Sequence, residues 1–159
     1  MSVEFRVAKL EDLPAIVALL ADDVLGQTRE QTSESAGEAG EVSDDYFNAF
    51  DLISIQAGNE VYVGEADGEI VATAQLTLIA NLSLKGTLRA QIEGVRVASS
   101  QRGQGTGEAL IKWLIEKSKT AGVGLVQLTT NKTREDALRF YEKLGFEASH
   151  EGMKLYLET

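Results

Sequence analysis

The sequence contains no cysteine, one histidine and one proline among 159 residues. Without cysteine the chain can form no disulfide framework, thiolate metal site or covalent cysteine intermediate. The single histidine, His150, lies in an expected turn and is interpreted as solvated, with a place near a binding site as the alternative. No second histidine or acidic cluster has metal-ligand spacing, so no metal site is predicted. No stretch approaches the ~18 consecutive apolar residues of a membrane span, and the first residues lack a secretion-signal pattern. We therefore expect a cytoplasmic protein with no membrane partner, folded as one domain over residues 1–159.

Basic residues are the minority, with 15 Lys and Arg against 25 Asp and Glu and a formal net charge of -10. A surface of this sign repels nucleic acid and favours the approach of cations. Between Asp22 and Asp51 the sequence holds nine acidic residues and one basic residue, Arg29. This concentration predicts a cationic substrate, although acidic loops are also commonly just solvated.

Apolar spacing predicts alternating strands and helices. Asp67-Gly68 separates two β-rich runs and is a strong signal for a hairpin with a type I′ turn. Ser43 is expected to cap a helix, and Pro14 suits the first turn of another. The predicted strands cover Val3–Val7, Val61–Ala66, Ile70–Leu78, Ala90–Val97, Leu125–Thr129, Phe146–Ser149 and Met153–Leu157. The predicted helices cover Leu13 to about Gly26, Asp44–Ile53, Gly105–Ala121 and Arg134–Leu144, with a loop from Gln27 to Glu41.

The segment Gln101–Gly107 places three alternate glycines between a strand and an amphipathic helix. Glycine lets the backbone turn sharply with its N–H groups outward, and the helix dipole adds positive potential, so the loop suits a pyrophosphate. Arg102 can add a charge-assisted contact. A flexible turn would explain the glycines alone. The segment lacks the Gly-Lys-Ser/Thr of nucleoside triphosphatases, and it follows an antiparallel meander, unlike a dinucleotide-binding fingerprint.

At Arg102, Gly105 and Gly107 the sequence resembles the signature of the Gcn5-related N-acetyltransferase (GNAT) family. The element order, the strand end Val95–Val97 and the run Asn131–Phe146 are also similar to that family. The resemblance implies an α/β GNAT fold, with a mixed, mostly antiparallel sheet and helices on both faces. It also implies acetyl-CoA as the cofactor.

The resemblance further implies roles for individual residues. Glu93 is interpreted as the general base, acting directly or through water, and Tyr141 as the acid that protonates the leaving thiolate. An exposed strand carboxylate and a buried core tyrosine are the alternatives, and a turn asparagine is the alternative for Asn131. The expected cofactor-binding residues are Val95, Arg96, Val97, Arg102, Gly103, Gln104, Gly105, Thr106, Gly107 and Asn131.

The expected activity is direct transfer of an acetyl group to a primary amine, with a small cationic molecule as the acceptor. Two alternatives remain open. One is a catalytically silent acyl-CoA sensor, and the other is an enzyme that acetylates a protein lysine or N-terminus. A homodimer is also expected, because members of the family often pair through their last strands.

Overall fold

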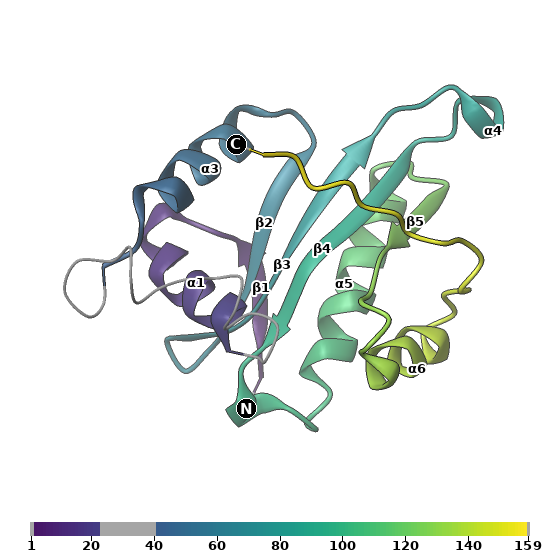
Figure 1. The fold of residues 1–159 in the computed structure, drawn as a ribbon. Helices are drawn as coiled ribbons and strands as arrows, with labels where there is room; N and C mark the ends of the chain where they lie inside the picture. Colours follow the sequence, from purple (N-terminus) through teal and green to yellow (C-terminus); the bar gives the residue numbers. More distant parts are fainter. Residues whose placement is uncertain (1, 23–40, 159) are drawn as a thin grey trace.

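The computed structural model describes residues 2–22 and 41–158. Within these ranges the strands form one sheet in the order β1-β2-β3-β4-β5 (Figure 1). The first three pairings are antiparallel and the β4–β5 pairing is parallel, which confirms the predicted mixed sheet. The strands are β1 Glu4–Val7, β2 Asn59–Ala66, β3 Glu69–Ile79, β4 Arg89–Val97 and β5 Leu125–Leu128.

Helices cover both faces of the sheet, as predicted. Side chains alternate between faces along a strand: Val63 packs with Ile16 of α1, and its neighbour Tyr62 packs in the cluster that contains Leu110 of α5. The α-helices are α1 Leu13–Ala21, α3 Asp44–Ile55, α4 Ser83–Gly86, α5 Thr106–Thr120 and α6 Glu135–Lys143, with 3-10 turns η1 Leu10–Asp12 and η2 Ser99–Gln101.

Local sequence signals account for several element boundaries. The Ser43 hydroxyl accepts a hydrogen bond from the Asp45 N–H at 3.3 Å and caps α3. Pro14 lies in the first turn of α1. Asp67 and Gly68 both have positive φ, at 51° and 80°, as a type I′ turn requires. The predicted hairpin between β2 and β3 is therefore confirmed.

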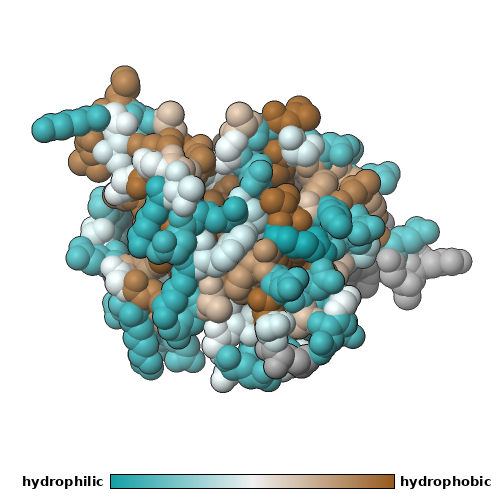
Figure 2. Space-filling view, turned by 180° about the vertical axis from the view of Figure 1, so that it is seen from behind, coloured by the Kyte–Doolittle hydropathy of each residue, from teal (hydrophilic) through white to brown (hydrophobic). Residues whose placement is uncertain are grey.

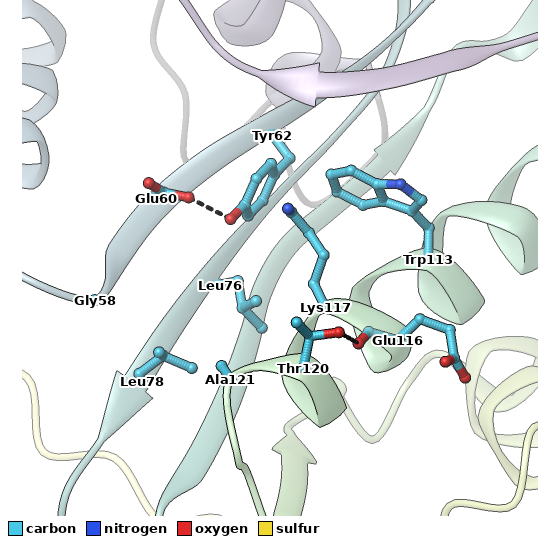
Figure 3. Close-up of a pocket in the computed structure, with 10 residues that line it drawn as sticks. All are labelled: Gly58, Glu60, Tyr62, Leu76, Leu78, Trp113, Glu116, Lys117, Thr120 and Ala121. Atoms are coloured by element: carbon cyan, nitrogen blue, oxygen red, sulfur yellow. Dashed lines mark hydrogen bonds between the residues drawn. The ribbon is translucent and has the colours of Figure 1, made fainter.

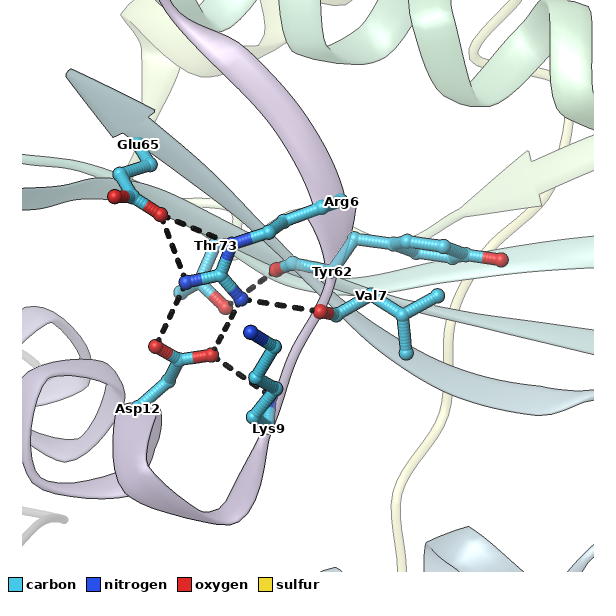
Figure 4. Close-up of polar contacts among 7 residues, drawn as sticks. All are labelled: Arg6, Val7, Lys9, Asp12, Tyr62, Glu65 and Thr73. Carbon is cyan, nitrogen blue, oxygen red and sulfur yellow. Dashed lines mark hydrogen bonds and ion pairs between the residues drawn. The ribbon is translucent and has the colours of Figure 1, made fainter. Parts of the chain in front are cut away.

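An ion-pair network fixes the N-terminal strand to its neighbours (Figure 4). The Arg6 guanidinium contacts the Asp12 carboxylate at 2.7 Å and the Glu65 carboxylate at 2.9 Å. The Asp12 carboxylate also accepts the Lys9 backbone N–H at 2.7 Å. These hydrogen bonds hold the pKa of Asp12 below its usual value and raise the pKa of Arg6. One arginine thus joins β1, η1 and β2.

The two C-terminal strands predicted over Phe146–Ser149 and Met153–Leu157 are wrong. Residues 146–158 belong to no helix or strand, and they run from α6 past β5 and β4 toward α3 (Figure 1). A strand needs a partner edge for its hydrogen bonds, and no described segment of this chain pairs with this one. As a result, Met153 and Leu155 are 93% and 86% exposed.

The N-terminal helix ends at Ala21, short of the predicted Gly26. Residues 23–40, which include all of the predicted loop except Glu41, lie outside the described residues. In the described ranges, no helix has the length and apolar character needed to cross a membrane.

The reverse side of the molecule has a largely hydrophilic surface interrupted by hydrophobic patches (Figure 2). One patch covers the protruding tip at α4, where Leu82 and Leu84 are 95% and 61% exposed. This tip joins β3 to β4, at the end of the sheet opposite the glycine-rich loop (Figure 1).

Candidate active site

The sheet opens between β4 and β5. The two strands pair from Arg89 with Leu125 to Ile92 with Leu128, and the pairing stops there. Beyond that point β4 continues to Val97 with β3 on one side only. Gly94 has φ +61°, and the β3–β4 register shifts between Thr73 and Gln75, which marks a bulge. The bulged half of β4 therefore presents a backbone edge without a partner strand among the described residues.

The glycine-rich loop lies beyond the end of this free edge. Gly103 and Gly105 have φ of +77° and +81°, and no atom lies within 4 Å of where a Cβ would stand on either. Gly105 is the N-cap of α5 and supplies no side-chain cap, so the first N–H groups of the helix keep their capacity for an external acceptor. The loop geometry thus fits a pyrophosphate at the α5 N-terminus.

Arg102 connects this loop to the end of α1. Its guanidinium donates to the Asp22 backbone oxygen at 3.0 Å and to the Val97 backbone oxygen at 3.3 Å. The Asp22 carboxylate lies 3.6 Å away. About half of the Arg102 side chain is exposed, so its charge remains accessible beside the loop.

Glu93 lies where the sheet begins to open, one residue after the last β4–β5 pair. Its carboxylate is exposed and accepts a hydrogen bond from the Gln91 amide. Gln75 is its cross-strand neighbour on β3. A carboxylate at this point can accept a proton from a molecule that reaches the opening.

Tyr141 lies in an aromatic cluster on α6. Its ring meets those of Phe140 and Phe146 edge to face, with centroids 5.1 and 5.7 Å apart. Burial raises the pKa of the Tyr141 hydroxyl, and the nearby charges of Arg96 and Arg134 oppose that shift. The hydroxyl therefore carries its proton at neutral pH, as a general acid must. The aromatic packing shows that Tyr141 also has the structural role expected of a core tyrosine.

Asn131 and Arg96 make local contacts. The Asn131 side-chain oxygen accepts from the Thr133 N–H at 3.0 Å and the Thr133 hydroxyl at 2.7 Å, which forms a turn just before α6. The Arg96 guanidinium donates to the Val95 backbone oxygen at 2.9 Å. Asn131 thus has the turn role that was its structural alternative.

Two cavities were not predicted. A cavity of about 460 Å³ lies between α5 and the β2–β3 hairpin (Figure 3). There the Lys117 ammonium stands 4.8 Å from the Trp113 ring and 5.4 Å from the Tyr62 ring. None of the predicted site residues lines it. A second cavity of about 170 Å³ lies under α1 and α3 and reaches Gln75 and Gly94, beside Glu93.

The residues present fit acetyl-CoA. The unpaired edge of β4 from Glu93 to Val97 offers backbone groups to an extended arm, and the α5 N-terminus with Gly103–Gly107 offers N–H groups to phosphates. Spatially, the structure brings Glu93, Val95, Val97 and the loop onto one continuous path along β4. Tyr141 lies on the neighbouring helix α6 and packs against the same core.

Known proteins with similar sequences are acetyltransferases. Residues 25–146 match the model of the acetyltransferase (GNAT) family. Glucosamine 6-phosphate N-acetyltransferase of Trypanosoma brucei brucei is 33% identical over 159 residues, covering 99% of this chain and 97% of that protein. Aminoalkylphosphonate N-acetyltransferase of Salmonella typhimurium is 34% identical over 84 residues, covering 53% and 54% of the two chains.

Solved structures agree in fold. A Bacillus halodurans C-125 protein described as a transcriptional regulator has a TM-score of 0.90 and 46% identity, covering 98% of this chain and 100% of that one. Glucosamine-6-phosphate N-acetyltransferase from Arabidopsis thaliana has a TM-score of 0.75 at 23% identity, over 99% of this chain and 100% of that one, which supports the fold alone. The predicted fold, family and donor are confirmed: this chain belongs to the GNAT family of acetyltransferases, whose members use acetyl-CoA as the acetyl donor.

Proposed function

We propose that this acetyltransferase moves the acetyl group directly from acetyl-CoA to the primary amine of a small molecule, without an acetyl-enzyme intermediate. The observation that carries the proposal is the opening of the sheet after Ile92, with Glu93 at its start and the glycine-rich loop beyond its far end. Acetyl-CoA supplies an acetyl group activated as a thioester. The chain contains no cysteine to accept that group, which favours attack by the amine itself.

Glu93 acts as the general base in this proposal. An amine is nucleophilic only after its ammonium form has lost a proton, and the exposed Glu93 carboxylate is placed to accept that proton directly or through water. The bond from the Gln91 amide orients the carboxylate. The oxygen of the acetyl group gains negative charge during attack, and backbone N–H groups on the free edge near Val95 are suited to stabilise it.

Tyr141 acts as the general acid. When the carbon–sulfur bond breaks, the Tyr141 hydroxyl donates its proton to the leaving sulfur. The raised pKa keeps this proton on the hydroxyl until it is needed. Arg96 and Arg134 are then placed to stabilise the tyrosinate by their charge.

The amine end of the acceptor is proposed to arrive as a cation. The support is the count of nine acidic residues against one basic residue between Asp22 and Asp51. Five of the acidic residues are described: Asp22, Glu41, Asp44, Asp45 and Asp51. A negative surface raises the local concentration of ammonium groups. The two curated relatives named above carry the names of acceptors that combine an amine with a phosphate or phosphonate group. A small acceptor of this kind is favoured over a protein.

The test is product formation from acetyl-CoA with a panel of amines: glucosamine 6-phosphate, an aminoalkylphosphonate, a diamine and a lysine-containing peptide. We expect an N-acetylated small amine by mass spectrometry, and no acetylated enzyme when the amine is omitted.

Glu93→Gln should lower kcat by at least ~100-fold, with partial recovery at high pH, where more amine is neutral. The control is Glu69→Gln, which changes an exposed carboxylate at the start of β3. An acetylated enzyme on the pathway, or equal rates in both variants, would contradict the proposal.

A further inference from the structure

One face of the sheet carries a row of uncharged polar side chains beside Glu93. Along β4, Ala90 and Ile92 are buried at 0% and 2% exposure against the α5 side. The alternate positions Gln91 and Glu93 therefore face the other way. Cross-strand neighbours continue this face over four strands. We call the following set the polar platform: Asn59, Gln75, Thr77, Gln91 and Gln127.

Hydrogen bonds across the strands hold the polar platform in place. Gln75 and Thr77 donate to the Asn59 side-chain oxygen at 2.8 and 3.2 Å. Gln127 donates to the Gln91 side-chain oxygen at 3.0 Å, and Gln91 in turn donates to Glu93. Each amide has two N–H donors and a carbonyl acceptor, so these bonds leave donors and acceptors for a ligand.

A solvated sheet face would explain polar residues but not this composition. Lys and Glu are mostly exposed in folded proteins, whereas all five platform residues are uncharged and half-buried. Side chains that are already fixed lose little entropy when they bind, which suits them to recognise a molecule with several hydroxyl groups. The bonds that run from Gln127 through Gln91 end on the proposed catalytic carboxylate.

Arg89 provides a cation at the far end of the same face. It lies two residues from Gln91 and four from Glu93 on β4, a span of roughly 13 Å along an extended strand. Its terminal nitrogen Nη2 donates to the Ser83 hydroxyl at 2.9 Å. Its Nε is buried and has no hydrogen-bond partner among residues 2–22 and 41–158. A buried guanidinium N–H without an acceptor is rare and is suited to a ligand oxygen.

We propose that the polar platform and Arg89 bind the acceptor, and that the acceptor is a hydroxyl-bearing amine with an anionic group at its other end. This inference rests on the proposed function, since it takes Glu93 as the point where the amine reacts. The amine lies at Glu93, the hydroxyl groups over the platform, and the anionic group at Arg89. Phosphate, sulfate and carboxylate share the chemistry that Arg89 recognises.

The experiment compares kcat/KM for four acceptors: glucosamine, glucosamine 6-phosphate, glucosamine 6-sulfate and an alkyl diamine. We expect the wild type to prefer the two anionic sugars over glucosamine by about tenfold or more, the effect of one charge-assisted hydrogen bond. Arg89→Met should lower kcat/KM for the two anionic sugars until that preference is lost. Lys119→Met, which removes an exposed cation at the end of α5, should keep the preference.

Two further variants test the contacts to the hydroxyl groups separately. Thr77→Val removes one hydroxyl with little change of shape, and Gln127→Leu removes one amide. Each should raise KM for the sugars and leave unchanged both KM for acetyl-CoA and the thermal shift produced by coenzyme A, which also reports that the variant is folded. The diamine, without hydroxyl groups, should show no change in KM.

The outcomes separate the two claims. If the wild type acetylates no amine, the proposed function fails and this inference fails with it. If the wild type acetylates amines but Arg89→Met keeps the preference for anionic sugars, or the diamine is the best acceptor, this inference alone is overturned.

Discussion

At the scale of single residues, Tyr141 is proposed to combine the two roles that its sequence position suggested as alternatives. Its ring packs edge to face with Phe140 and Phe146, while burial raises the pKa of its hydroxyl. A tyrosine of this kind holds its proton throughout the neutral range, so the hydroxyl is still protonated when a leaving thiolate forms beside it. The same burial that stabilises the fold therefore prepares the acid.

We predict that Tyr141→Phe keeps the fold and the binding of coenzyme A and lowers kcat by about 100-fold or more. The ring stays in the aromatic cluster and only the proton is lost. Because the Tyr141 pKa lies above the ordinary value of about 10, wild-type kcat should show no decline from this group as the pH rises to about 9. Stopped assays across pH measure both effects. A Phe variant with wild-type kcat would leave Tyr141 with its packing role alone.

The ionisation of Asp12 contributes to the stability of the N-terminal strand. Arg6 and the Lys9 N–H hold its folded pKa below the unfolded value, so its contribution is present above about pH 4. It is lost as the pH falls through the folded pKa, because the carboxyl must then be protonated.

We predict that Asp12→Asn lowers the free energy of unfolding at pH 7 by about 1–3 kcal/mol. The deficit should shrink on acidification below about pH 4, where the wild type loses the same interaction. Urea unfolding at several pH values measures this. Glu11→Gln, which alters the adjacent exposed carboxylate of η1, is the control. A deficit independent of pH would show that the Asp12 charge is not what holds β1 to η1.

At the scale of elements, we propose that the loop and helix start from Gly103 to Gly107 determine cofactor affinity. Gly105 has positive φ and open space around its Cβ position. A side chain placed there would strain the backbone and would meet a ligand that binds at the loop. Asparagine tolerates this backbone region better than most residues. Aspartate has nearly the same shape and adds a negative charge.

We predict that Gly105→Asp weakens coenzyme A binding much more than Gly105→Asn, because only the charge differs and it repels a pyrophosphate. Isothermal titration measures the two dissociation constants, and unfolding measurements separate the strain. Gly122→Asp, at a glycine with the same φ of +81° beyond the far end of α5, should leave binding unchanged. Equal affinities in the two Gly105 variants would show that no anionic group approaches the α5 N-terminus.

The elements that sequence predicted well are those fixed by local chemistry. Asp67-Gly68 specified the turn between β2 and β3. Ser43 specified the start of α3. The terminal strands were wrong because a strand depends on a partner edge that alternation alone does not reveal. The polar platform was missed for a similar reason: Gln75 becomes a neighbour of Glu93 only through the β3–β4 register.

At the scale of the whole molecule, the exposed C-terminal segment suggests self-association. Its alternate residues Met153, Leu155 and Leu157 are 93%, 86% and 76% exposed. Within the described residues, the outer edge of β5 has no partner. An apolar extended segment and a free strand edge on one chain are the two parts of a strand-exchange dimer.

We predict that the protein is a homodimer through this segment. Light scattering with size-exclusion chromatography should give twice the chain mass, and Leu155→Lys combined with Leu157→Lys should give a monomer that still binds coenzyme A. Leu82→Lys, at the exposed α4 tip, should stay dimeric. A monomeric wild type at micromolar concentration would contradict this prediction.

The central claim is that acetyl-CoA binds along the free edge of β4 with its pyrophosphate at the N-terminus of α5. A crystal structure of the protein with coenzyme A tests it most directly. The account predicts phosphate oxygens within hydrogen-bond distance of the backbone N–H groups of Gly105–Gly107, and the pantetheine arm beside Glu93–Val97. Coenzyme A in the 460 Å³ cavity beside Trp113 and Lys117, with the β4 edge free, would contradict it.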